Sequence, residues 1–271
     1  MHLEQQDLSQ ILETAIVAAR LAGQRAMEEI HYVKATLKHE TELVTETDRR
    51  CQQIIVNRIR ESFPDAGFIG EEGEPGQIFK RPPRGEPALW WVIDPIDGTN
   101  NFAHGIPMFA VSIGALLEGR PVAGVVFNPA TDSMYTAVAG GEAQLDGRRI
   151  QSGTDDITPI TSVGLDSHFG ETLPPWVQLI VRQCRFRNFG TTALQMAYVA
   201  GGGLVGMVGC TPKLWDLAAG AALVEASGAT ITDWQGQPLF PIDPADYEGA
   251  PFQLVAGNPT AHPKLLEYLK W

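Results

Sequence analysis

Two aspartates spaced three residues apart follow an apolar run near the middle of the chain. The run is residues 90–93 (WWVI), and residues 94–99 (DPIDGT) come directly after it. Asp and Gly are good turn residues, so many strings of this kind are simply solvated turns. A turn that follows an apolar strand would project Asp94 and Asp97 to one side, with backbone carbonyls exposed between them. Such a set of oxygen atoms suits a hard cation.

Other acidic side chains stand next to apolar segments elsewhere in the chain. Glu71 and Glu72 come directly after the apolar residues 67–69. Asp216 stands at the start of an Ala-rich segment with helical character, and Asp48 follows the residues VTET at the start of another. Asp is among the best helix-capping residues, so a cap is an equally simple role for the last two.

A cluster of Glu71, Asp94, Asp97 and Asp216 would need positive charge between its members. Four carboxylates brought together repel one another and titrate abnormally unless divalent cations neutralise them. Carboxylates without His or Cys ligands favour Mg²⁺ over Zn²⁺. The residue types therefore predict a magnesium site where these segments meet.

The segments that carry these acids resemble the signature segments of the inositol monophosphatase family. They are residues 71–72 (EE), 94–99 (DPIDGT) and 215–220 (WDLAAG), and the match extends collinearly to residues 43–48 (LVTETD) and 190–192 (GTT). The resemblance implies an α/β (α+β) fold, a layered αβαβα sandwich of the inositol monophosphatase and fructose-1,6-bisphosphatase type. It also implies Mg²⁺-dependent hydrolysis of a small phosphate monoester without a phosphoenzyme.

The resemblance implies a ligand set for each metal ion. Glu71, Asp94 and the carbonyl oxygen of Ile96 are expected to hold one Mg²⁺ ion. Asp94, Asp97 and Asp216 are expected to hold a second, and a third, weaker ion is expected near Glu71, which makes two to three ions. Two ions roughly 3.5–4 Å apart can bridge a phosphate ester and lower the pKa of a bound water.

The same resemblance implies catalytic roles for Asp48, Thr99 and Glu71. Thr99 is expected to hydrogen-bond the attacking water and Asp48 to accept a hydrogen bond from Thr99, so that this pair orients and helps deprotonate the nucleophile. A turn-stabilising hydroxyl is the simpler role for Thr99, and the two roles are compatible. The backbone amides of Gly98 and Thr99 suit phosphate oxygens. The predicted substrate contacts are Asp97, Gly98, Thr99, Gly190, Thr191, Thr192, Lys213 and Asp216.

One position departs from the inositol-preferring relatives and leaves the substrate open. Gly209 stands seven residues before Asp216, where those relatives have a glutamate that contacts sugar hydroxyls. Lys213 is either solvated, as most lysines are, or meets a second anionic group of the substrate. An inositol monophosphate-like polyol or sugar phosphate is the first expectation. Histidinol phosphate, fructose 1,6-bisphosphate and adenosine bisphosphate are the alternatives.

Functions of other classes are tested by the motifs that the sequence lacks. It has no D-x-D string for an aspartyl-phosphate mechanism, no Cys-x₅-Arg loop, no G-x-x-x-x-G-K-[ST] loop and no H-E-x-x-H pattern. A metal-dependent binding protein without catalysis is the remaining alternative. Such a protein would need the metal ligands but not Asp48 and Thr99, and because both are present an enzyme is favoured.

Composition and charge exclude several kinds of partner. With 271 residues, 44% of them apolar and 19% charged, the chain is long enough for one large domain or two halves. A net charge of −12 without a run of Lys or Arg argues against nucleic acid and anionic membranes as partners. The odd number of cysteines and the absence of a long apolar run predict a cytoplasmic protein. The resemblance adds a homodimer and inhibition by lithium.

Hydrophobic periodicity predicts the elements that must position these residues. Helices are expected over residues 7–30, 47–63, 174–184, 192–200, 215–227 and 263–269. Strands are expected over residues 67–69, 89–93, 109–117, 122–127, 134–139, 162–165, 229–232 and 253–256.

Two polar stretches divide this pattern. Residues 151–159 predict a boundary between an α+β half, 1–152, with most metal ligands, and an α/β half, 153–271, with Asp216 and the substrate contacts. Residues 31–46 match a mobile loop that in the family closes over the metals, and Lys38 is expected near the third ion.

Overall fold

The structure is a computed structural model of the chain. It describes residues 4–32, 35–37, 43–74, 76–85, 88–166, 169 and 172–270, with the backbone alone at 35–37 and 43–44. The helices are α1 (Gln5–Glu29), α2 (Glu46–Ser62), α3 (Thr99–Ala103), α4 (Pro175–Gln183), α5 (Thr192–Ala200), α6 (Leu214–Ala226) and α7 (Ala261–Tyr268).

The larger sheet has eight strands in the order β10-β9-β8-β7-β6-β5-β3-β4. It is mixed, because β3 runs parallel to β5 while the other neighbours are antiparallel. Its strands are β3 (Gly67–Gly70), β4 (Phe79–Arg81), β5 (Leu89–Asp97), β6 (Ala110–Leu117), β7 (Arg120–Asn128), β8 (Ser133–Val138), β9 (Gln144–Leu145) and β10 (Arg148–Arg149).

The smaller sheet has five strands in the order β12-β11-β13-β15-β14. Strand β11 is parallel to β12 and β13, whereas β15 is antiparallel to β13 and β14. Its strands are β11 (Ser162–Leu165), β12 (Arg185–Arg187), β13 (Gly206–Gly209), β14 (Thr230–Thr232) and β15 (Leu254–Gly257). A separate antiparallel pair is formed by β1 (Ala35–Leu37) and β2 (Leu43–Thr45).

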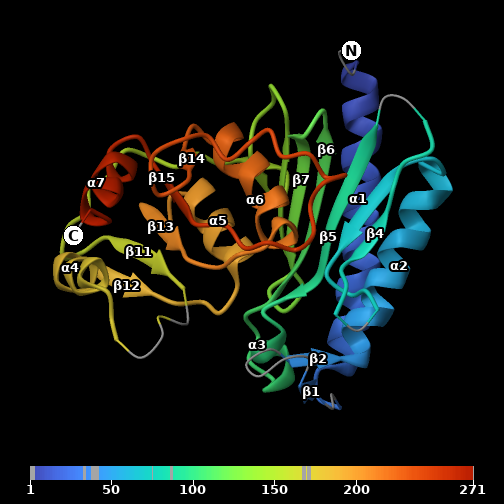
Figure 1. The fold of residues 1–271 in the computed structure, drawn as a ribbon, viewed down its shortest axis with the longest axis horizontal. Coiled ribbons are helices and arrows are strands. Elements are labelled where there is room, and N and C mark those ends of the chain that lie inside the picture. Colours follow the sequence, from blue (N-terminus) through green and yellow to red (C-terminus); the bar gives the residue numbers. More distant parts are fainter. Residues whose placement is uncertain are drawn as a thin grey trace.

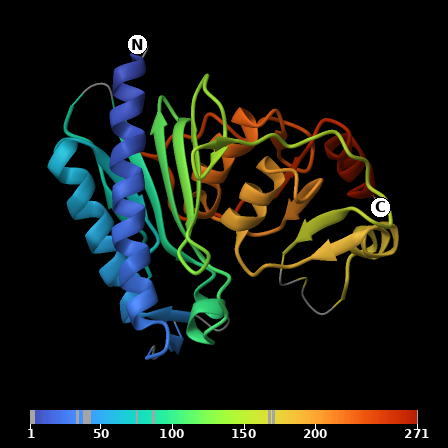
Figure 2. The same ribbon diagram turned by 180° about the vertical axis from the view of Figure 1, so that it is seen from behind.

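The elements stack in five layers (Figures 1 and 2). Helices α1 and α2 cover one face of the larger sheet, α5 and α6 lie between the two sheets, and α4 and α7 lie outside the smaller sheet. The predicted αβαβα sandwich is thereby confirmed. Because helices cover both faces of the larger sheet, every residue of β5 and β6 is buried, and apolar residues predominate in both strands.

Helix α6 lies directly against strands β6 and β7. A Cβ atom on Gly124 would lie 2.3 Å from the carbonyl oxygen of Ala219, and one on Gly114 would lie 2.8 Å from the Cβ of Ala218. The Ala-rich sequence of this helix therefore permits an approach that larger side chains would block. As a result, the first turn of α6 lies beside the carboxyl end of β5.

The structure corrects the predicted starts of three helices. Helices α1, α2 and α6 each begin one or two residues earlier than expected, because the expected capping aspartate occupies the third helical position. From there its carboxylate reaches back to the backbone N–H of the residue that does cap the helix, an arrangement typical of a capping box. The pairs are Glu4 N to Asp7 Oδ2 (3.0 Å), Thr45 N to Asp48 Oδ2 (3.0 Å) and Lys213 N to Asp216 Oδ2 (2.7 Å).

Short elements were missing from the sequence prediction. They are β1, β2, β4, β9, β10, β12 and β13, each four residues or fewer, together with the five-residue helix α3. Strand β13 is central and fully buried, yet two of its four residues are Gly, a type depleted in strands. Strands β1 and β2 occupy part of the expected loop at 31–46, and Lys38 lies outside the described residues.

The segment between the two sheets includes the polar stretch 151–159. Residues 150–161 contain no helix or strand, and they connect β10 of the larger sheet to β11 of the smaller one. The division into halves at 152 and 153 stays a prediction, because α5 and α6 pack against both sheets.

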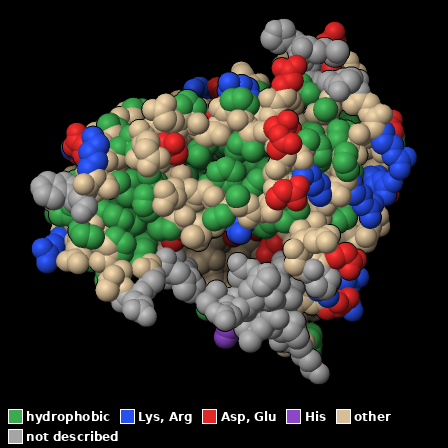
Figure 3. Space-filling model, viewed as in Figure 1, with side chains coloured by type: hydrophobic (Ala, Val, Ile, Leu, Met, Phe, Trp, Pro, Cys, Tyr) green, Lys and Arg blue, Asp and Glu red, His purple; other side chains and the backbone are tan. Residues whose placement is uncertain are grey.

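The apolarity of the helices and the distribution of basic side chains bear on possible partners. Across its described residues, the chain forms no helix with the length and apolarity needed to cross a membrane. On the face drawn in Figure 3, Lys and Arg side chains gather at the right, where Figure 1 places α2 and β4.

Candidate metal centre and active site

Strand β5 supplies two carboxylates to one side of the sheet. The sequence suggested that Asp94 and Asp97 lie in a turn, but the strand continues through Asp97 and its pairing with β6 shifts register between them. Asp94 pairs with Ser112 and Asp97 with Ala110, so three steps on β5 match two on β6. Residues three apart on a regular strand face opposite sides, and the bulge corrects this parity. Pro95 lies in the bulge, where its missing N–H removes no ladder hydrogen bond.

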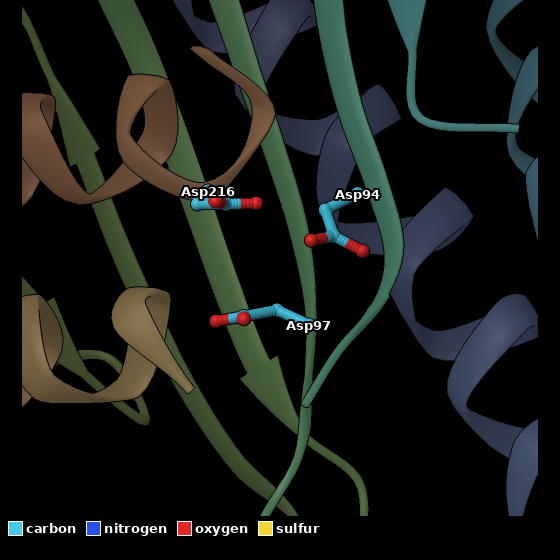
Figure 4. Close-up of side chains that lie close together, drawn as sticks. All are labelled: Asp94, Asp97 and Asp216. Carbon is cyan, nitrogen blue, oxygen red and sulfur yellow. The ribbon is translucent and has the colours of Figure 1, made fainter. Parts of the chain in front are cut away.

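The third carboxylate comes from the first turn of α6. Asp216 lies opposite Asp94 and Asp97, and the three side chains point into the same space (Figure 4). One carboxylate oxygen from each of them lies within 4.8 Å of the other two. Asp94 and Asp97 are buried and Asp216 is partly buried.

Glu71 approaches this cluster from the neighbouring strand. Strand β3 ends at Gly70, which pairs with Ile93 in the parallel ladder, so Glu71 follows β3 where Asp94 continues β5. The negative charge of Glu71 raises the pKa of Asp94, which indicates that the two carboxylates are close. The remaining predicted ligand, the carbonyl oxygen of Ile96, accepts a hydrogen bond from the Thr99 hydroxyl at 3.0 Å.

Burial and mutual repulsion raise the pKa values of these carboxyl groups. Burial, followed by the charges of Glu71, Asp97 and Asp216, places the pKa of Asp94 well above its ordinary value. Burial raises the pKa of Asp97 to about 6, against the opposing effect of hydrogen bonds. Burial and the charge of Asp97 raise the pKa of Asp216 to about 7. A bound cation would therefore stabilise the ionised form of these carboxyl groups.

The donor set fits a hard divalent cation. Within the described part of the chain, no ion pair joins Asp94, Asp97 or Asp216 to a Lys or Arg side chain. Asp94 and Asp216 are instead close enough to share a proton through a hydrogen bond. A cluster of carboxylate oxygens suits Mg²⁺, which prefers oxygen ligands.

Asp48 and Thr99 form a hydrogen-bonded pair next to this cluster. The hydroxyl group of Thr99 donates to Asp48 Oδ1 or to the carbonyl oxygen of Ile96, each 3.0 Å away. Asp48 is 1% exposed, and burial raises its pKa to about 6 against the opposing effect of hydrogen bonds from Thr45. The pair that the resemblance assigned to the water therefore comes from two helices, with Asp48 on α2 and Thr99, 51 residues later in the sequence, on α3.

The second half of the chain reaches the same place through the start of α5. Asp97 Oδ2 accepts hydrogen bonds from the Thr191 hydroxyl at 2.5 Å and from the backbone N–H of Ala193 at 2.6 Å, and the backbone N–H of Thr192 also donates to this carboxylate. Gly98 has φ of 95°, and a Cβ atom there would lie 3.0 Å from the carbonyl oxygen of Gly190. The structure thus brings residues 190–192 against Gly98 and Asp97.

Lys213 has its own partner in the protein. Its Nζ donates to the carbonyl oxygen of Gly249 at 2.9 Å, and its backbone N–H donates to Asp216. The hydrogen bond to Gly249 directs the ammonium group toward the loop that contains this residue. Its role as a substrate contact stays a prediction.

Asp166 is a residue near the site that the sequence interpretation did not consider. Its carboxylate follows β11 and accepts hydrogen bonds from the backbone N–H groups of Cys210 and Thr211, which follow β13. Its charge contributes to the raised pKa values of Asp97 and Asp216. An acid directly after the apolar strand 162–165 is the same signal that drew attention to Asp94, and it could have been recognised.

Comparisons with known proteins agree on one family. The sequence profile of the inositol monophosphatase family matches residues 7–270. The chain is 35% identical to an inositol-1-monophosphatase of Rhizobium meliloti (strain 1021) over 84% of this chain and 87% of that protein. It is 32% identical to the Nus factor SuhB of Escherichia coli (strain K12) over 92% and 91% of the two chains. The crystal structure of the extragenic suppressor protein suhB from Bartonella henselae has a TM-score of 0.84 at 30% identity, over 96% of this chain and 98% of that one.

Proposed function

Because the chain belongs to the inositol monophosphatase family, we propose that it hydrolyses small phosphate monoesters in a Mg²⁺-dependent reaction. The observation that carries this proposal is the convergence of Asp94, Asp97 and Asp216 within 4.8 Å, beside the hydrogen-bonded pair of Thr99 and Asp48. Metal binding alone requires the carboxylates but not this pair, so its presence beside them supports hydrolysis over binding alone.

In the proposed site, Glu71, Asp94 and the Ile96 carbonyl hold one Mg²⁺ ion, and Asp94, Asp97 and Asp216 hold a second. When bound, these ions supply Lewis-acid activation of the phosphate ester and of the attacking water. The carboxylates contribute the fixed negative charge that keeps the ions in place, and their hydrogen bonds to backbone N–H groups hold them in orientation. A third ion near Glu71 remains part of the proposal.

The chain's own contribution to the chemical step is the orientation of water. Thr99 has a single hydroxyl hydrogen, so when it donates to Asp48 Oδ1 its oxygen lone pairs accept from a water molecule. Asp48 accepts the proton relayed through this hydroxyl, and its pKa of about 6 lies close enough to neutrality for a general base. Glu71 completes the proposed catalytic set.

We propose substrate contacts for residues around Asp97. The backbone amides of Gly98 and Thr99 face the phosphate, and residues 190–192 contact the organic part of the substrate. Asp97 and Asp216 contribute contacts of their own. Lys213 would join them only if it left the carbonyl oxygen of Gly249.

A polyol or sugar phosphate is the proposed substrate class, with histidinol phosphate, fructose 1,6-bisphosphate and adenosine bisphosphate as alternatives. Gly209 gives no side-chain acceptor for sugar hydroxyls, which separates this chain from the inositol-preferring pattern. Several relatives are named Nus factors, and a non-catalytic role is therefore an explicit outcome of the test below. From family membership we further infer a homodimer, a cytoplasmic location and inhibition by lithium.

The proposal is tested by measuring phosphate release from inositol 1-phosphate, histidinol phosphate, fructose 1,6-bisphosphate and adenosine bisphosphate, with Mg²⁺ and with EDTA. We expect release from at least one ester, only with Mg²⁺, and we expect Asp94→Asn to abolish it while the variant remains folded. Asp65→Asn makes the same chemical change at an exposed position and serves as the control. Release from none of the esters would favour the non-catalytic alternative, and an active Asp94→Asn variant would overturn the metal assignment.

A further inference from the structure

Gln52 makes two hydrogen bonds to the backbone of a single residue. Its Nε2 donates to the carbonyl oxygen of Glu72 at 2.7 Å, and its Oε1 accepts from the backbone N–H of Glu72 at 3.0 Å. The side chain is buried, with 5% of its surface exposed. The side-chain amide of Gln52 thus satisfies both the N–H and the carbonyl group of Glu72, which lies outside the sheets.

These hydrogen bonds join the two parts of the proposed site. Gln52 lies one helical turn after Asp48, so both side chains project from the same face of α2. The N–H group of Glu72 belongs to the peptide bond that joins it to Glu71. A single side chain therefore ties the helix that carries Asp48 to the peptide that carries Glu71.

The turn that carries Glu71 lies outside the helices and strands, and it has a backbone hydrogen bond of its own from Gly73 N–H to the carbonyl oxygen of Glu71 at 3.2 Å. Residues 71–74 follow β3 and belong to no helix or strand. The Glu72 side chain is buried, with Arg49 Nε 3.9 Å from its Oε2, and its charge contributes to the raised pKa of Asp48. The turn therefore brings two acids beside further carboxylates, where charge repulsion acts on its position and the hydrogen bonds of Gln52 oppose a displacement.

Gly70 is an independent sign that this attachment is built into the fold. A Cβ atom at residue 70 would lie 2.4 Å from Gln52 Oε1, whereas its next neighbour, Phe79 Cδ1, would be at an ordinary 3.4 Å. Gly70 does not have a positive φ, so its backbone conformation is open to other residues. The space that its missing side chain leaves is filled by the amide of Gln52.

We propose that Gln52 is a positioning residue for the metal site, whose amide fixes the Glu71–Glu72 peptide relative to Asp48 and so holds Glu71 ready for Mg²⁺. The proposal rests on the proposed function in assigning Glu71 to a metal ion. Groups that orient metal ligands commonly change metal affinity 10–100-fold when they are removed.

The first test compares Gln52→Met with Gln53→Met in a titration of thermal unfolding with Mg²⁺. Methionine has a similar volume but makes neither hydrogen bond. We expect Gln52→Met to raise the Mg²⁺ concentration for half of the stabilisation about tenfold or more. Gln53 is exposed on the same helix, where its amide donates to Asn57, so we expect Gln53→Met to leave this concentration unchanged. Equal midpoints for Gln52→Met and the wild type would overturn the proposal.

A double-mutant cycle separates positioning from general loss of stability. Gly70→Ala should displace the amide and raise the Mg²⁺ midpoint, because its Cβ occupies the position of Gln52 Oε1. In a Gln52→Ala background that Cβ has room, so we expect Gly70→Ala to add no further change there. Additive effects in the two backgrounds would contradict the proposal. The cycle also tests the proposal if Gln52→Met folds poorly. Gly70→Ala is expected to fold, because the added Cβ makes close contacts only with side-chain atoms of Gln52, which can move.

Activity measured on the same variants distinguishes failure of this proposal from failure of the proposed function. Mg²⁺ binding with the expected midpoints but no phosphate release in the wild type would retain the role of Gln52 and refute the phosphatase. Phosphate release with unchanged midpoints in Gln52→Met would refute the role of Gln52 and retain the phosphatase. A wild-type chain that Mg²⁺ does not stabilise would overturn both.

Discussion

Asp48 uses its two carboxylate oxygens for different neighbours. Oδ2 accepts hydrogen bonds from the backbone N–H and the hydroxyl of Thr45, which closes the start of α2, while Oδ1 accepts from Thr99. The helix-capping and catalytic interpretations of this residue are therefore compatible, because each occupies one oxygen. The cap holds the carboxylate in the orientation that the Thr99 hydroxyl needs.

At Thr99 we expect Thr99→Val to lower kcat about 10²-fold or more, because the variant keeps the volume but cannot orient the water. The Mg²⁺ midpoint for stabilisation should change much less than kcat, since the side chain is not itself a proposed ligand. Steady-state phosphate release and the thermal titration measure the two quantities. Thr99→Ser keeps the hydroxyl and should retain most of the activity. Equal losses in the two variants would mean that the hydroxyl has no catalytic role.

The positions of the elements depend on close approaches between backbones. Helix α6 carries Asp216, and it reaches β5 only because the residues that separate it from the sheet are small. The bulge in β5 also determines the geometry of the site, because it turns both Asp94 and Asp97 toward α6. Neither device is catalytic, yet both determine where the carboxylates meet.

For the contact between α6 and β7 we expect Gly124→Ala to lower the free energy of unfolding by about 1–3 kcal/mol, the usual range for overpacking. The added methyl group would lie 2.3 Å from the carbonyl oxygen of Ala219, so the helix must shift and carry Asp216 with it. Urea unfolding and the Mg²⁺ midpoint should both change. Gly85→Ala is the control, because a Cβ atom there meets nothing within 4 Å. A normal Mg²⁺ midpoint in Gly124→Ala would show that the position of α6 does not limit the site.

The whole molecule carries a net charge of −12, and four acidic groups lie in or beside the site: Asp48, Asp94 and Asp97 are buried and Asp216 is partly buried. Their folded pKa values lie above the ordinary value of 3.8, at about 6 for Asp48 and Asp97 and about 7 for Asp216. The folded chain therefore binds more protons than the unfolded chain between about pH 4 and pH 7. Without metal, the contribution of these groups to stability is present at low pH and is lost as the pH rises through their folded pKa values.

From this linkage we expect the stabilisation by saturating Mg²⁺ to grow between pH 5.5 and pH 7.5. At the lower pH protons compete with the cation for the carboxylates, and at the higher pH the cation relieves their repulsion. The rise in Tm on addition of Mg²⁺, measured at several pH values, checks this expectation. Asp94→Asn removes one charge from the cluster, so its metal-free Tm should fall less with pH than that of the wild type. A rise in Tm that is independent of pH would contradict the linkage.

Charge at the scale of the molecule is also distributed unevenly. The sequence contains no run of Lys or Arg, and this argued against anionic macromolecules as partners. In the folded chain, basic side chains from separate segments gather over α2 and β4 (Figure 3). Net charge and sequence runs are therefore incomplete guides to the charge that a partner meets, because folding decides which side chains become neighbours.

The sequence by itself determined the residue types of the site, the longer elements and the family. Continuous apolar runs indicate strands buried on both faces, and the three-and-four spacing of residues 7–30 indicates a helix, because these periodicities are local properties of the chain. The carboxylates of residues 94, 97 and 216 were recognisable because their segments match a known family.

Only the tertiary structure decided how these residues meet. The bulge at Asp94 and Asp97, the aspartates at the third position of three helices, and the amide of Gln52 against Gly70 all depend on contacts between segments distant in sequence or on backbone register. Short strands such as β13 were not predicted, because they are stabilised by pairing with the neighbouring strands more than by the strand propensity of their own residues. Local patterns specify which side chains are available, whereas packing sets the distances between them, and metal binding and proton transfer depend on those distances.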